Sequence, residues 1–332
     1  MPFDFHDCWF LTGPTASGKS AVAIELAKRI GAEIVSMDSM ALYVGMDIGT
    51  AKPTVAERRE IPHHLIDVLD PREEFSVAQY VDAAERSATG IVGRGRQVLF
   101  VGGTPLYLKA LLRGMFEGPP ADWQLRHQLA NEAARCDAGW LHRRLAEVDP
   151  AAAARLHAND QRRIIRALEV FEKTGRPISQ WQRQFEIGRP AAECRVFALD
   201  WPKAELHARM DCRVEEMFAA GLVEEVRGLL LVGPNAISAR ADETERNASR
   251  LETEKVPLSR TARQAVGYRE VIEHLEGRHT LAKTIELVQL HTRQLAKRQM
   301  TWFRSLSECR FMPVAGPFDP RTVAERLRGT AK

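Results

Sequence analysis

The sequence contains a phosphate-binding loop near its beginning, and this motif constrains the fold more than any other feature of the chain. The loop reads Gly13-Pro14-Thr15-Ala16-Ser17-Gly18-Lys19-Ser20. Its glycines let backbone amides close around an anion, its lysine adds a positive charge, and its last hydroxyl can bind Mg²⁺. We therefore predict a phosphorylated or pyrophosphorylated ligand in this region, with Ser20 as the candidate metal ligand.

Strand-like and helix-like segments alternate along the chain. Residues 8–12 and 34–36 are typical of short buried strands, and residues 20–30 between them carry apolar side chains at helical spacing. Further strands are expected at residues 98–101 and 196–200. The alternation predicts an α/β fold, a P-loop NTPase-like parallel sheet flanked by helices, with ligands bound at the carboxyl ends of the strands.

The middle of the chain has a different character from both ends. From residue 123 to residue 184 the pattern is helical and rich in arginine, which predicts a helical insertion domain. Residues 203–231 are expected to be helical, whereas the polar stretch 232–260 lacks aromatic residues and is expected to be a mobile loop. The expected organisation is a first part of the core at 1–120, the insertion at 121–190 and completion of the core at 191–332, which includes a long basic helix at 281–303.

The overall composition excludes several classes of protein. A net charge of +3 is too small to identify a nucleic-acid-binding protein by itself, so that assignment depends on where basic residues cluster. The first residues include acids where a signal peptide would be basic, and no apolar run approaches the roughly 18 residues of a membrane-spanning helix. Five widely spaced cysteines contain no Cys-x-x-Cys pair. We expect a cytoplasmic protein with reduced thiols and no membrane contact.

The strand at residues 98–101 ends without the acid that usually holds Mg²⁺ in nucleotide hydrolases. It continues into Gly102-Gly103-Thr104, and the nearest alternative acid, Asp67 in the segment 65–68, is expected inside a strand. This departure argues against a simple ATP-binding hydrolase. It favours a ligand that carries a diphosphate without a nucleoside.

A carboxylate follows the strand at residues 34–36. Asp38 and Ser39 are expected at the same edge of the sheet as the P-loop, which would place a base near a phosphate. The alternative is an aspartate that only caps a turn or a helix. The position of Asp38 alone does not separate these two interpretations.

Two basic helical segments are candidates for RNA contact. Residues 291–304 carry four basic side chains, no acid and the pair Trp302-Phe303, a mixture that suits phosphate contact and base stacking. Residues 159–175 combine an apolar face with several arginines, and we expect Asn159 and Gly175 to cap this helix. Both patterns also fit ordinary amphipathic helices with solvated basic faces.

Together these segments resemble a known family, the tRNA dimethylallyltransferases, also called tRNA isopentenyltransferases. The resemblance runs from the P-loop to Arg304 and covers nearly the whole chain. The matching blocks are Gly13 to Ser20, Asp38-Ser39, Tyr43, Gly45 to Pro53, Gly102-Gly103-Thr104, Gln161-Arg162, Arg166 to Val170, Val266-Gly267-Tyr268-Arg269, Gln294 to Gln299 and Thr301-Trp302.

The resemblance implies a reaction and its substrates. A dimethylallyl group would pass from dimethylallyl diphosphate to the exocyclic amine, N6, of adenosine-37, which lies 3′ of the anticodon in tRNA. The product would be N6-isopentenyladenosine, and the P-loop would hold diphosphate with Mg²⁺ instead of ATP. The expected partners are the tRNA anticodon stem-loop and dimethylallyl diphosphate, and the expected state is a monomer.

The resemblance also implies roles for particular residues. Asp38 would be the general base or the positioning group for the amine, Thr104 a hydroxyl donor to the leaving oxygen, and Arg213 a second clamp on the diphosphate. The tRNA contacts would be Asp38, Ser39, Met40, Ala41, Thr104, Arg126, Gln161, Arg162, Arg163, Ile164, Ile165, Gln264, Gly267, Tyr268, Arg269, Arg293, Lys297, Arg298 and Arg304.

The residue types suit this chemistry, although the chain departs from the family in places. A carboxylate that accepts a proton assists attack by an adenine amine, and cations offset the charge on a leaving diphosphate. Many family members carry glutamine where this chain has Ala41, so one polar contact to the base is missing. Three alternatives share parts of the pattern: a P-loop small-molecule kinase, an isopentenyltransferase that acts on free adenine nucleotides, and an RNA-binding module whose P-loop only senses a nucleotide.

Overall fold

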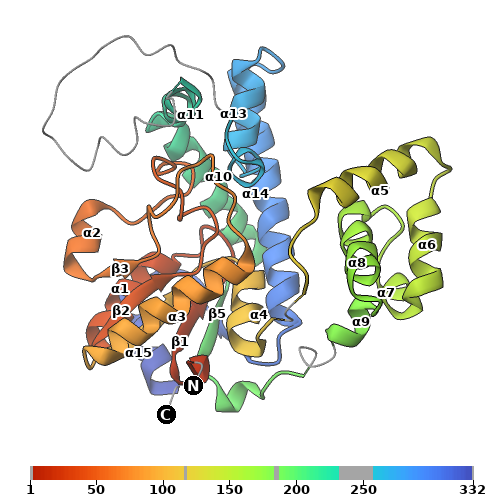
Figure 1. The fold of residues 1–332 in the computed structure, drawn as a ribbon. Helices are drawn as coiled ribbons and strands as arrows, with labels where there is room; N and C mark the ends of the chain where they lie inside the picture. The colour runs from red at the N-terminus through yellow and green to blue at the C-terminus, as the bar shows by residue number, and fades with distance from the viewer. Residues whose placement is uncertain (1–2, 116–117, 183–186, 232–256, 331–332) are drawn as a thin grey trace, which may run out of the picture. The chain divides into compact units, whose positions relative to one another are not determined.

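Six parallel strands form one sheet in a computed structural model of the chain, which describes residues 3–115, 118–182, 187–231 and 257–330 (Figure 1). The strand order is β3-β2-β4-β1-β5-β6. The bounds are β1 Trp9–Thr12, β2 Ala32–Ser36, β3 His63–His64, β4 Gln97–Val101, β5 Val196–Asp200 and β6 Cys309–Pro313. This sheet and its flanking helices confirm the predicted α/β class.

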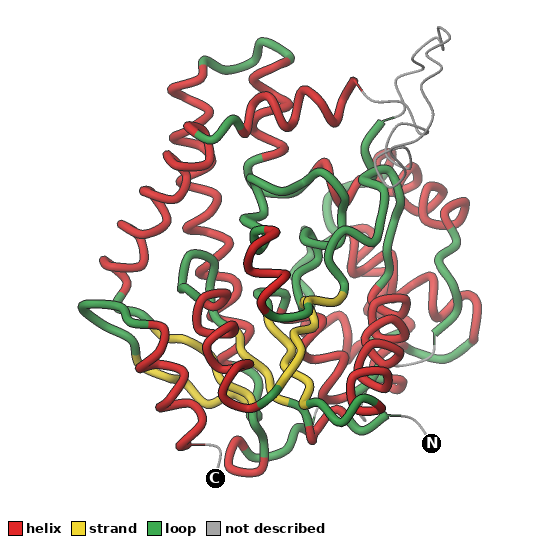
Figure 2. The backbone as a smooth tube through the Cα atoms, turned by 90° about the vertical axis from the view of Figure 1, so that its left-hand side faces the viewer, coloured by secondary structure: helices red, strands yellow, loops and turns green. Residues whose placement is uncertain are grey.

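The central strands are buried on both faces, because their alternate side chains enter two separate cores. Trp9 and Leu11 of β1 pack on one face with helices α1 (Lys19–Ile30) and α15 (Pro320–Thr330). Phe10 packs on the other face with α3 (Val77–Gly93) and α4 (Pro105–Arg113), where its ring stacks on that of Phe100 at 5.0 Å. Helices therefore lie on both sides of the layer of strands, as Figure 2 shows.

A third core is formed by loop residues after β2 and by helices from the later part of the chain. Tyr43 and Met46 are fully buried against Leu222, Val226 and Tyr268. The helices of this part are α10 Lys203–Ala219, α11 Leu222–Leu231, α12 Arg260–Arg263, α13 Tyr268–Leu275 and α14 Leu281–Arg304. The short helices η1 Phe5–Asp7, α2 Val55–Glu60 and η3 Ala191–Glu193 complete the unit that contains the sheet, which spans residues 1–112 and 189–332.

Residues 113–188 form a second unit, which is entirely helical in its described part and has a core of its own. The unit begins eight residues before, and ends two residues before, the range expected for the insertion. Its core contains Leu129, Leu145, Ile164 and Leu168, all nearly or fully buried. Its helices are α5 Trp123–Arg135, α6 Trp140–Val148, α7 Pro150–Arg155, α8 Gln161–Thr174 and α9 Ile178–Trp181.

Most predicted strands and helices are present, with four differences. The segment 65–68 is not a strand, since Leu65 and Asp67 have left-handed φ values of 59° and 56°. The helix expected at 203–231 is divided at Gly221, whose φ is +97°. Asp160, not Asn159, caps α8 by accepting the Arg163 N–H, whereas the Gly175 cap is confirmed. Strand β6 and helix α15 follow the long basic helix and were not expected.

The loop expected at residues 232–260 falls largely in a stretch that the structure does not describe. Most of the predicted mobile loop, residues 232–256, lies outside the described residues. Its last residues, 257–260, are described: Leu258 is buried, and Ser259 caps α12.

Within the described part of the chain, no helix combines the length and the apolar character needed to cross a bilayer. The five cysteines are free thiols, of which Cys8, Cys194 and Cys309 are buried.

Candidate active site

The P-loop connects the end of β1 to the first turn of α1. Gly13 has φ +140°, and a Cβ there would lie 3.0 Å from the Leu199 carbonyl oxygen, so a side chain has no room. Lys19 folds back over the loop and donates from Nζ to the Pro14 carbonyl at 2.7 Å. The first N–H groups of α1 have no partner within the helix, which makes this helix end a site for an anion.

A cavity of about 430 Å³ opens beside this loop, and all of its lining residues belong to the unit that contains the sheet. The cavity is lined by Asp38, Thr104 and Arg213, which come from three different parts of the chain. The P-loop residues Lys19 and Ser20 line it as well. The other lining residues that matter here are Thr15, Ser39, Met40, Ala41, Gly49, Thr50, Ala51, Lys52, Pro53, Gln264, Tyr268, Arg298 and Gln299.

Two cations in the cavity, Lys19 and Arg213, are largely shielded from water, and neither forms an ion pair with another described residue. Burial, with a smaller effect from nearby Arg213, lowers the pKa of Lys19 from its ordinary value of 10.5 to about 8, while Asp38 acts in the opposite direction. Burial also lowers the pKa of Arg213. Its guanidinium makes only long contacts, 3.4 Å to Thr15 Oγ1 and 3.5 Å to the Thr50 carbonyl. A bound anion would stabilise the charged form of both groups.

The buried Nε of Arg213 also indicates that an anion can bind here. Its Nε has no hydrogen-bond partner among the described residues. A buried donor without an acceptor is costly, and such groups are rare unless a ligand or a water satisfies them. The local geometry is therefore that of an anion site.

Asp38 and Thr104 are held in place by backbone hydrogen bonds at the carboxyl ends of β2 and β4. Asp38 Oδ1 accepts the Met40 N–H at 2.9 Å, so the turn role considered for this aspartate is real, yet its side chain also lines the cavity. Thr104 Oγ1 accepts the Ser39 N–H at 3.0 Å and lies 3.4 Å from Ser39 Oγ. The second distance is long for a hydroxyl pair, so the Thr104 proton can be donated to a ligand.

Gln299 joins the P-loop to the Gly102-Gly103-Thr104 turn and was not among the predicted site residues. Its Oε1 accepts the Thr15 N–H at 3.0 Å, and its Nε2 donates to the Gly103 carbonyl at 2.6 Å. A Cβ at Gly103 would lie 2.6 Å from Nε2, and one at Gly102 would lie 2.0 Å from the Met37 carbonyl oxygen. The sequence shows Gln299 as one polar residue in a basic helix, and its burial could not be inferred from that pattern.

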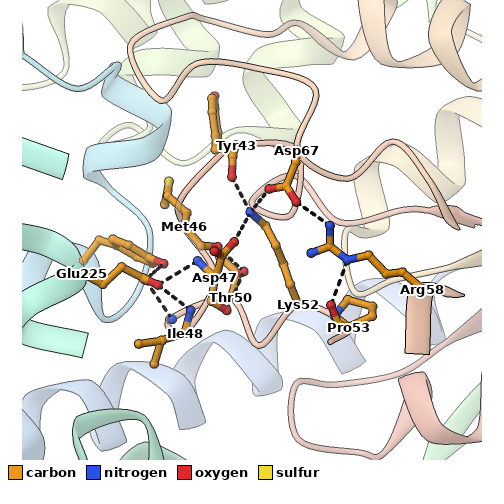
Figure 3. Close-up of polar contacts among 12 residues, drawn as sticks. Tyr43, Met46, Asp47, Ile48, Thr50, Lys52, Pro53, Arg58, Asp67 and Glu225 are labelled. Carbon is orange, nitrogen blue, oxygen red and sulfur yellow. Dashed lines mark hydrogen bonds and ion pairs between the residues drawn. The ribbon is translucent and has the colours of Figure 1, made fainter. Parts of the chain in front are cut away.

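The loop that lines the cavity at residues 49–53 is held by a network of charged groups (Figure 3). The Lys52 side chain is 1% exposed and lies between Asp47, at 2.8 Å, and Asp67, at 2.5 Å. The Glu225 carboxylate accepts the backbone N–H groups of Asp47 and Ile48, at 3.0 and 2.7 Å, as the dashed lines in Figure 3 show. Asp67 is thus an anchor for this loop, not the strand acid considered from the sequence.

The predicted RNA contacts in the sheet-containing unit fall into different environments. Lys297 and Arg298 are exposed on α14, and Gln264 is exposed at the cavity. Arg293 pairs with both oxygens of Asp211, at 3.0 and 2.8 Å, and Arg304 lies 3.7 Å from Asp200.

Residues at the start of α13 are also more structural than expected. Gly267, with φ +95°, caps the helix, and its N–H donates to Glu270 at 2.7 Å. Tyr268 is fully buried and donates to Glu225 at 2.5 Å, so its side chain belongs to a core, although it borders the cavity. Arg269 pairs with Glu270 at 2.6 Å. Ala41 is 6% exposed.

The predicted RNA contacts in the helical unit need one correction. Gln161, Arg162 and Arg163 are exposed at the start of α8. Ile164 and Ile165 are buried in the core of the unit at 0% and 8% exposure, so their side chains do not offer an RNA contact.

Arg126 is also engaged within the helical unit. It forms two hydrogen bonds, at 2.9 and 2.8 Å, with the carboxylate of Glu169, which is fully buried. Its guanidinium also lies over the Trp123 ring, 5.0 Å from the centroid.

The sheet, the P-loop and the cavity define a P-loop α/β protein in which the geometry of an anion site lies beside a carboxylate. A sequence model described as IPP transferase matches residues 41–306, and one described as Isopentenyl transferase matches residues 6–68. The chain is 46% identical to a tRNA dimethylallyltransferase of Geobacter metallireducens over 92% of both chains. It is also 46% identical to a tRNA dimethylallyltransferase of Rhodopirellula baltica, over 92% of this chain and 87% of that one.

Solved structures show the same relationship. A tRNA isopentenylpyrophosphate transferase from Bacillus halodurans has a TM-score of 0.64 at 34% identity and covers 98% of this chain and 97% of its own. A eukaryotic dimethylallyltransferase, described as acting on tRNA, has a TM-score of 0.71 at 25% identity, with coverage of 92% and 73%. The chain therefore belongs to the tRNA dimethylallyltransferase (IPP transferase) family and is a transferase. The resemblance noted in the sequence is confirmed.

Proposed function

We propose that the protein transfers a dimethylallyl group from dimethylallyl diphosphate to N6 of the adenosine 3′ of the anticodon, adenosine-37, in tRNA. One observation carries this proposal. The cavity brings a P-loop with two ion-pair-free cations, Lys19 and Arg213, next to the carboxylate of Asp38 and the hydroxyl of Thr104. The family relationship supports the choice of prenyl group and tRNA.

The diphosphate would bind at residues 13–20, where the amides at the start of α1 face an anion. Lys19 and Arg213 would supply its counter-charges, and both would regain normal pKa values as the ligand replaced water. Thr104 would donate to the oxygen that bridges the diphosphate and the prenyl group. These interactions strengthen as negative charge accumulates on the leaving group, and for this reason they favour the transition state.

In the transfer step the adenine N6 forms a bond to the allylic carbon while the carbon–oxygen bond to the diphosphate breaks. The electron pair of that bond leaves with the diphosphate. The amine loses one proton, and the Asp38 carboxylate would accept it. The turn at Met40 fixes the direction of this carboxylate through its backbone N–H.

The oxygen donors at the cavity fit Mg²⁺. The hydroxyl of Ser20 is exposed at the start of α1 and lines the cavity, and Asp38 adds a carboxylate. No group of three or more His, Cys, Asp or Glu side chains within the described ranges could hold a metal ion. This agrees with Mg²⁺ chemistry, in which one or two protein ligands, waters and phosphate oxygens suffice. When bound, Mg²⁺ would neutralise part of the charge of the diphosphate.

The tRNA would bind through exposed cations and reach the cavity with its target base flipped out of the stack. Exposed Lys297 and Arg298 support this role in α14, as do Gln161, Arg162 and Arg163 at the start of α8. The ion-paired residues Arg126, Arg269, Arg293 and Arg304, with Gln264, Gly267, Ser39, Met40 and Ala41 near the cavity, remain proposed contacts. We also propose that the protein is a monomer and acts on tRNA in the cytoplasm.

Labelled dimethylallyl diphosphate tests the proposal directly. The protein is incubated with the labelled compound and Mg²⁺, together with an anticodon stem-loop, with AMP, or with neither. We expect label in the stem-loop alone and no transfer when the target adenosine is replaced by guanosine. Label in AMP alone would show that the acceptor is a free nucleotide and would refute the proposal. Transfer of phosphate from ATP to a small molecule, with no prenyl transfer, would indicate a kinase instead.

A further inference from the structure

The side of the P-loop that does not line the cavity contacts three residues from distant parts of the chain, two through hydrogen bonds and one through its ring. Arg209 in α10 donates from Nε to the Ala16 carbonyl at 3.0 Å. Trp201, which directly follows β5, donates from its indole N–H to the Ser17 carbonyl at 3.0 Å. Phe318 contacts the loop at Gly18, where an added Cβ would lie 2.5 Å from its ring. None of these residues has a role in the proposed chemistry.

Arg209 packs over two neighbouring aromatic rings. Its guanidinium carbon lies 4.5 Å from the Trp201 ring centroid and 5.1 Å from that of Phe318. The two rings are 5.4 Å apart and tilted by 48°. The turn that carries Phe318 is itself attached to α10, because Glu205 accepts the Gly316 N–H at 3.1 Å. The planar guanidinium thus loses little additional freedom when it bonds the loop.

The bonded residue, Ala16, has a backbone conformation that alanine avoids. Its φ is +61°, in the left-handed region, where the Cβ crowds the carbonyl oxygen. Such strain persists only when the surrounding structure imposes it, and it is common at functional sites. A charge-assisted hydrogen bond to the Ala16 carbonyl is strong enough to stabilise this conformation.

The two carbonyl bonds also fix the orientation of the neighbouring backbone amides of the loop. In a trans peptide the C=O and the following N–H point in opposite directions. With the Ser17 carbonyl bonded to Trp201, the Gly18 N–H points to the opposite side, toward the anion site. In the same way, the bond from Arg209 to the Ala16 carbonyl leaves the Ser17 N–H pointing into the loop, where it donates to the Pro14 carbonyl at 3.3 Å.

We propose that Arg209, which packs over Trp201 and Phe318, is a positioning residue that keeps Ala16 left-handed and so preorganises the P-loop backbone for the diphosphate. This inference rests on the proposed diphosphate site. It goes beyond that site, because it makes the affinity for the ligand depend on a side chain that does not touch the ligand.

Inorganic pyrophosphate with Mg²⁺ is the probe for this test, and its dissociation constant is measured by titration calorimetry for the full chain. In Arg209→Met the side chain can still pack over the two rings but no longer bonds the Ala16 carbonyl. We expect the dissociation constant to rise about tenfold, which corresponds to about 1.4 kcal/mol. Arg195→Met is the matched control, because Arg195 also bonds one carbonyl, that of Asp7 at 3.0 Å, and lies over Trp9 at 5.6 Å. We expect it to lower the melting temperature to a similar extent and to leave the dissociation constant unchanged.

A second substitution separates positioning from general stability. Because glycine adopts left-handed φ without strain, Ala16→Gly should recover most of the lost affinity in the Arg209→Met background. If Arg209→Met does not fold, Trp201→Phe keeps the ring and removes only the bond to Ser17, and it should raise the dissociation constant several-fold. An unchanged dissociation constant in these variants, or no recovery with Ala16→Gly, would overturn the inference and leave the proposed function intact. Failure of the wild-type protein to bind pyrophosphate would instead overturn the diphosphate site itself.

Discussion

The protonation of Lys19 should make pyrophosphate binding weaken above neutral pH. Burial lowers the pKa of this ammonium group to about 8 in the ligand-free protein. Free lysine keeps its proton until about pH 10. Raising the pH from 7 to 9 therefore removes a positive charge from the P-loop.

The expected change in the dissociation constant of pyrophosphate follows from the fraction of protein molecules in which Lys19 is protonated. With a pKa of about 8, about one protein molecule in ten keeps the Lys19 proton at pH 9, whereas nearly all keep it at pH 7. A bound diphosphate stabilises the ammonium and raises its pKa, so ligand binding at pH 9 must include the uptake of a proton. The dissociation constant should then rise about tenfold between pH 7 and pH 9, a change of about 1.4 kcal/mol.

The same pKa predicts how the stability of the ligand-free protein depends on pH. The Lys19 pKa falls from 10.5 in the unfolded chain to about 8 in the folded protein, so at neutral pH the buried charge costs about 3 kcal/mol of folding free energy. Between pH 8 and pH 10.5 the unfolded chain binds more protons than the folded protein. The contribution of Lys19 therefore becomes less unfavourable as the pH rises through this window.

Calorimetric titration with pyrophosphate and Mg²⁺ at pH 7, 8 and 9 measures the effect. The reference is Lys19→Arg, because a guanidinium stays charged throughout this range. The titration of pyrophosphate itself affects both proteins and cancels in the ratio of their dissociation constants, wild type over variant. We expect this ratio to increase about tenfold from pH 7 to pH 9. A ratio that stays constant over this range would refute the reasoning, because Lys19 would then not lose its proton in the ligand-free protein.

Three further substitutions address the chemistry, the RNA interface and the helical unit. Asp38→Ala should lower kcat by about 10² to 10⁴ and leave stem-loop affinity nearly unchanged, and full turnover would exclude Asp38 as the base. Lys297→Ala should weaken stem-loop binding and reduce the slope of log affinity against log salt by about one, in filter binding at several salt concentrations. Glu169→Ala should lower the free energy of unfolding by about 3 kcal/mol, because the guanidinium of Arg126 loses its buried partner. Chemical denaturation measures this loss, and an unchanged unfolding midpoint would argue against the role of Glu169.

Local sequence patterns were sufficient to predict much of the sheet and the position of the cavity. The strands at 34–36, 98–101 and 196–200 are short apolar runs beside turn residues, and such runs predict buried strands well. Asp38 and Thr104 follow two of these strands, so parallel pairing alone was enough to bring them to one edge of the sheet.

The errors arose where burial or backbone conformation depends on distant residues. The segment at 65–68 has the composition of a strand, yet it adopts left-handed conformations at Leu65 and Asp67 because Asp67 bonds the buried Lys52. Ile164 lies in a block that resembles an RNA contact, but no local pattern shows that a core encloses its side chain. Strand β6 pairs with a strand more than one hundred residues earlier, and because Arg310 and Pro313 interrupt its apolar residues, no continuous apolar run marks it in the sequence.

The contact between Phe318 and Gly18 has a consequence for how the protein is made. The P-loop is among the first segments to leave the ribosome, but the neighbours that hold its carbonyls, Trp201 and Arg209, are synthesised almost two hundred residues later. The ring that abuts Gly18 comes three hundred residues after that glycine. At typical elongation rates of about 5–20 residues per second, the nascent chain spends some tens of seconds with an incomplete phosphate site. A chain that stops before residue 318 therefore lacks the ring that packs against Gly18, and we expect it to bind the diphosphate more weakly than the full chain does.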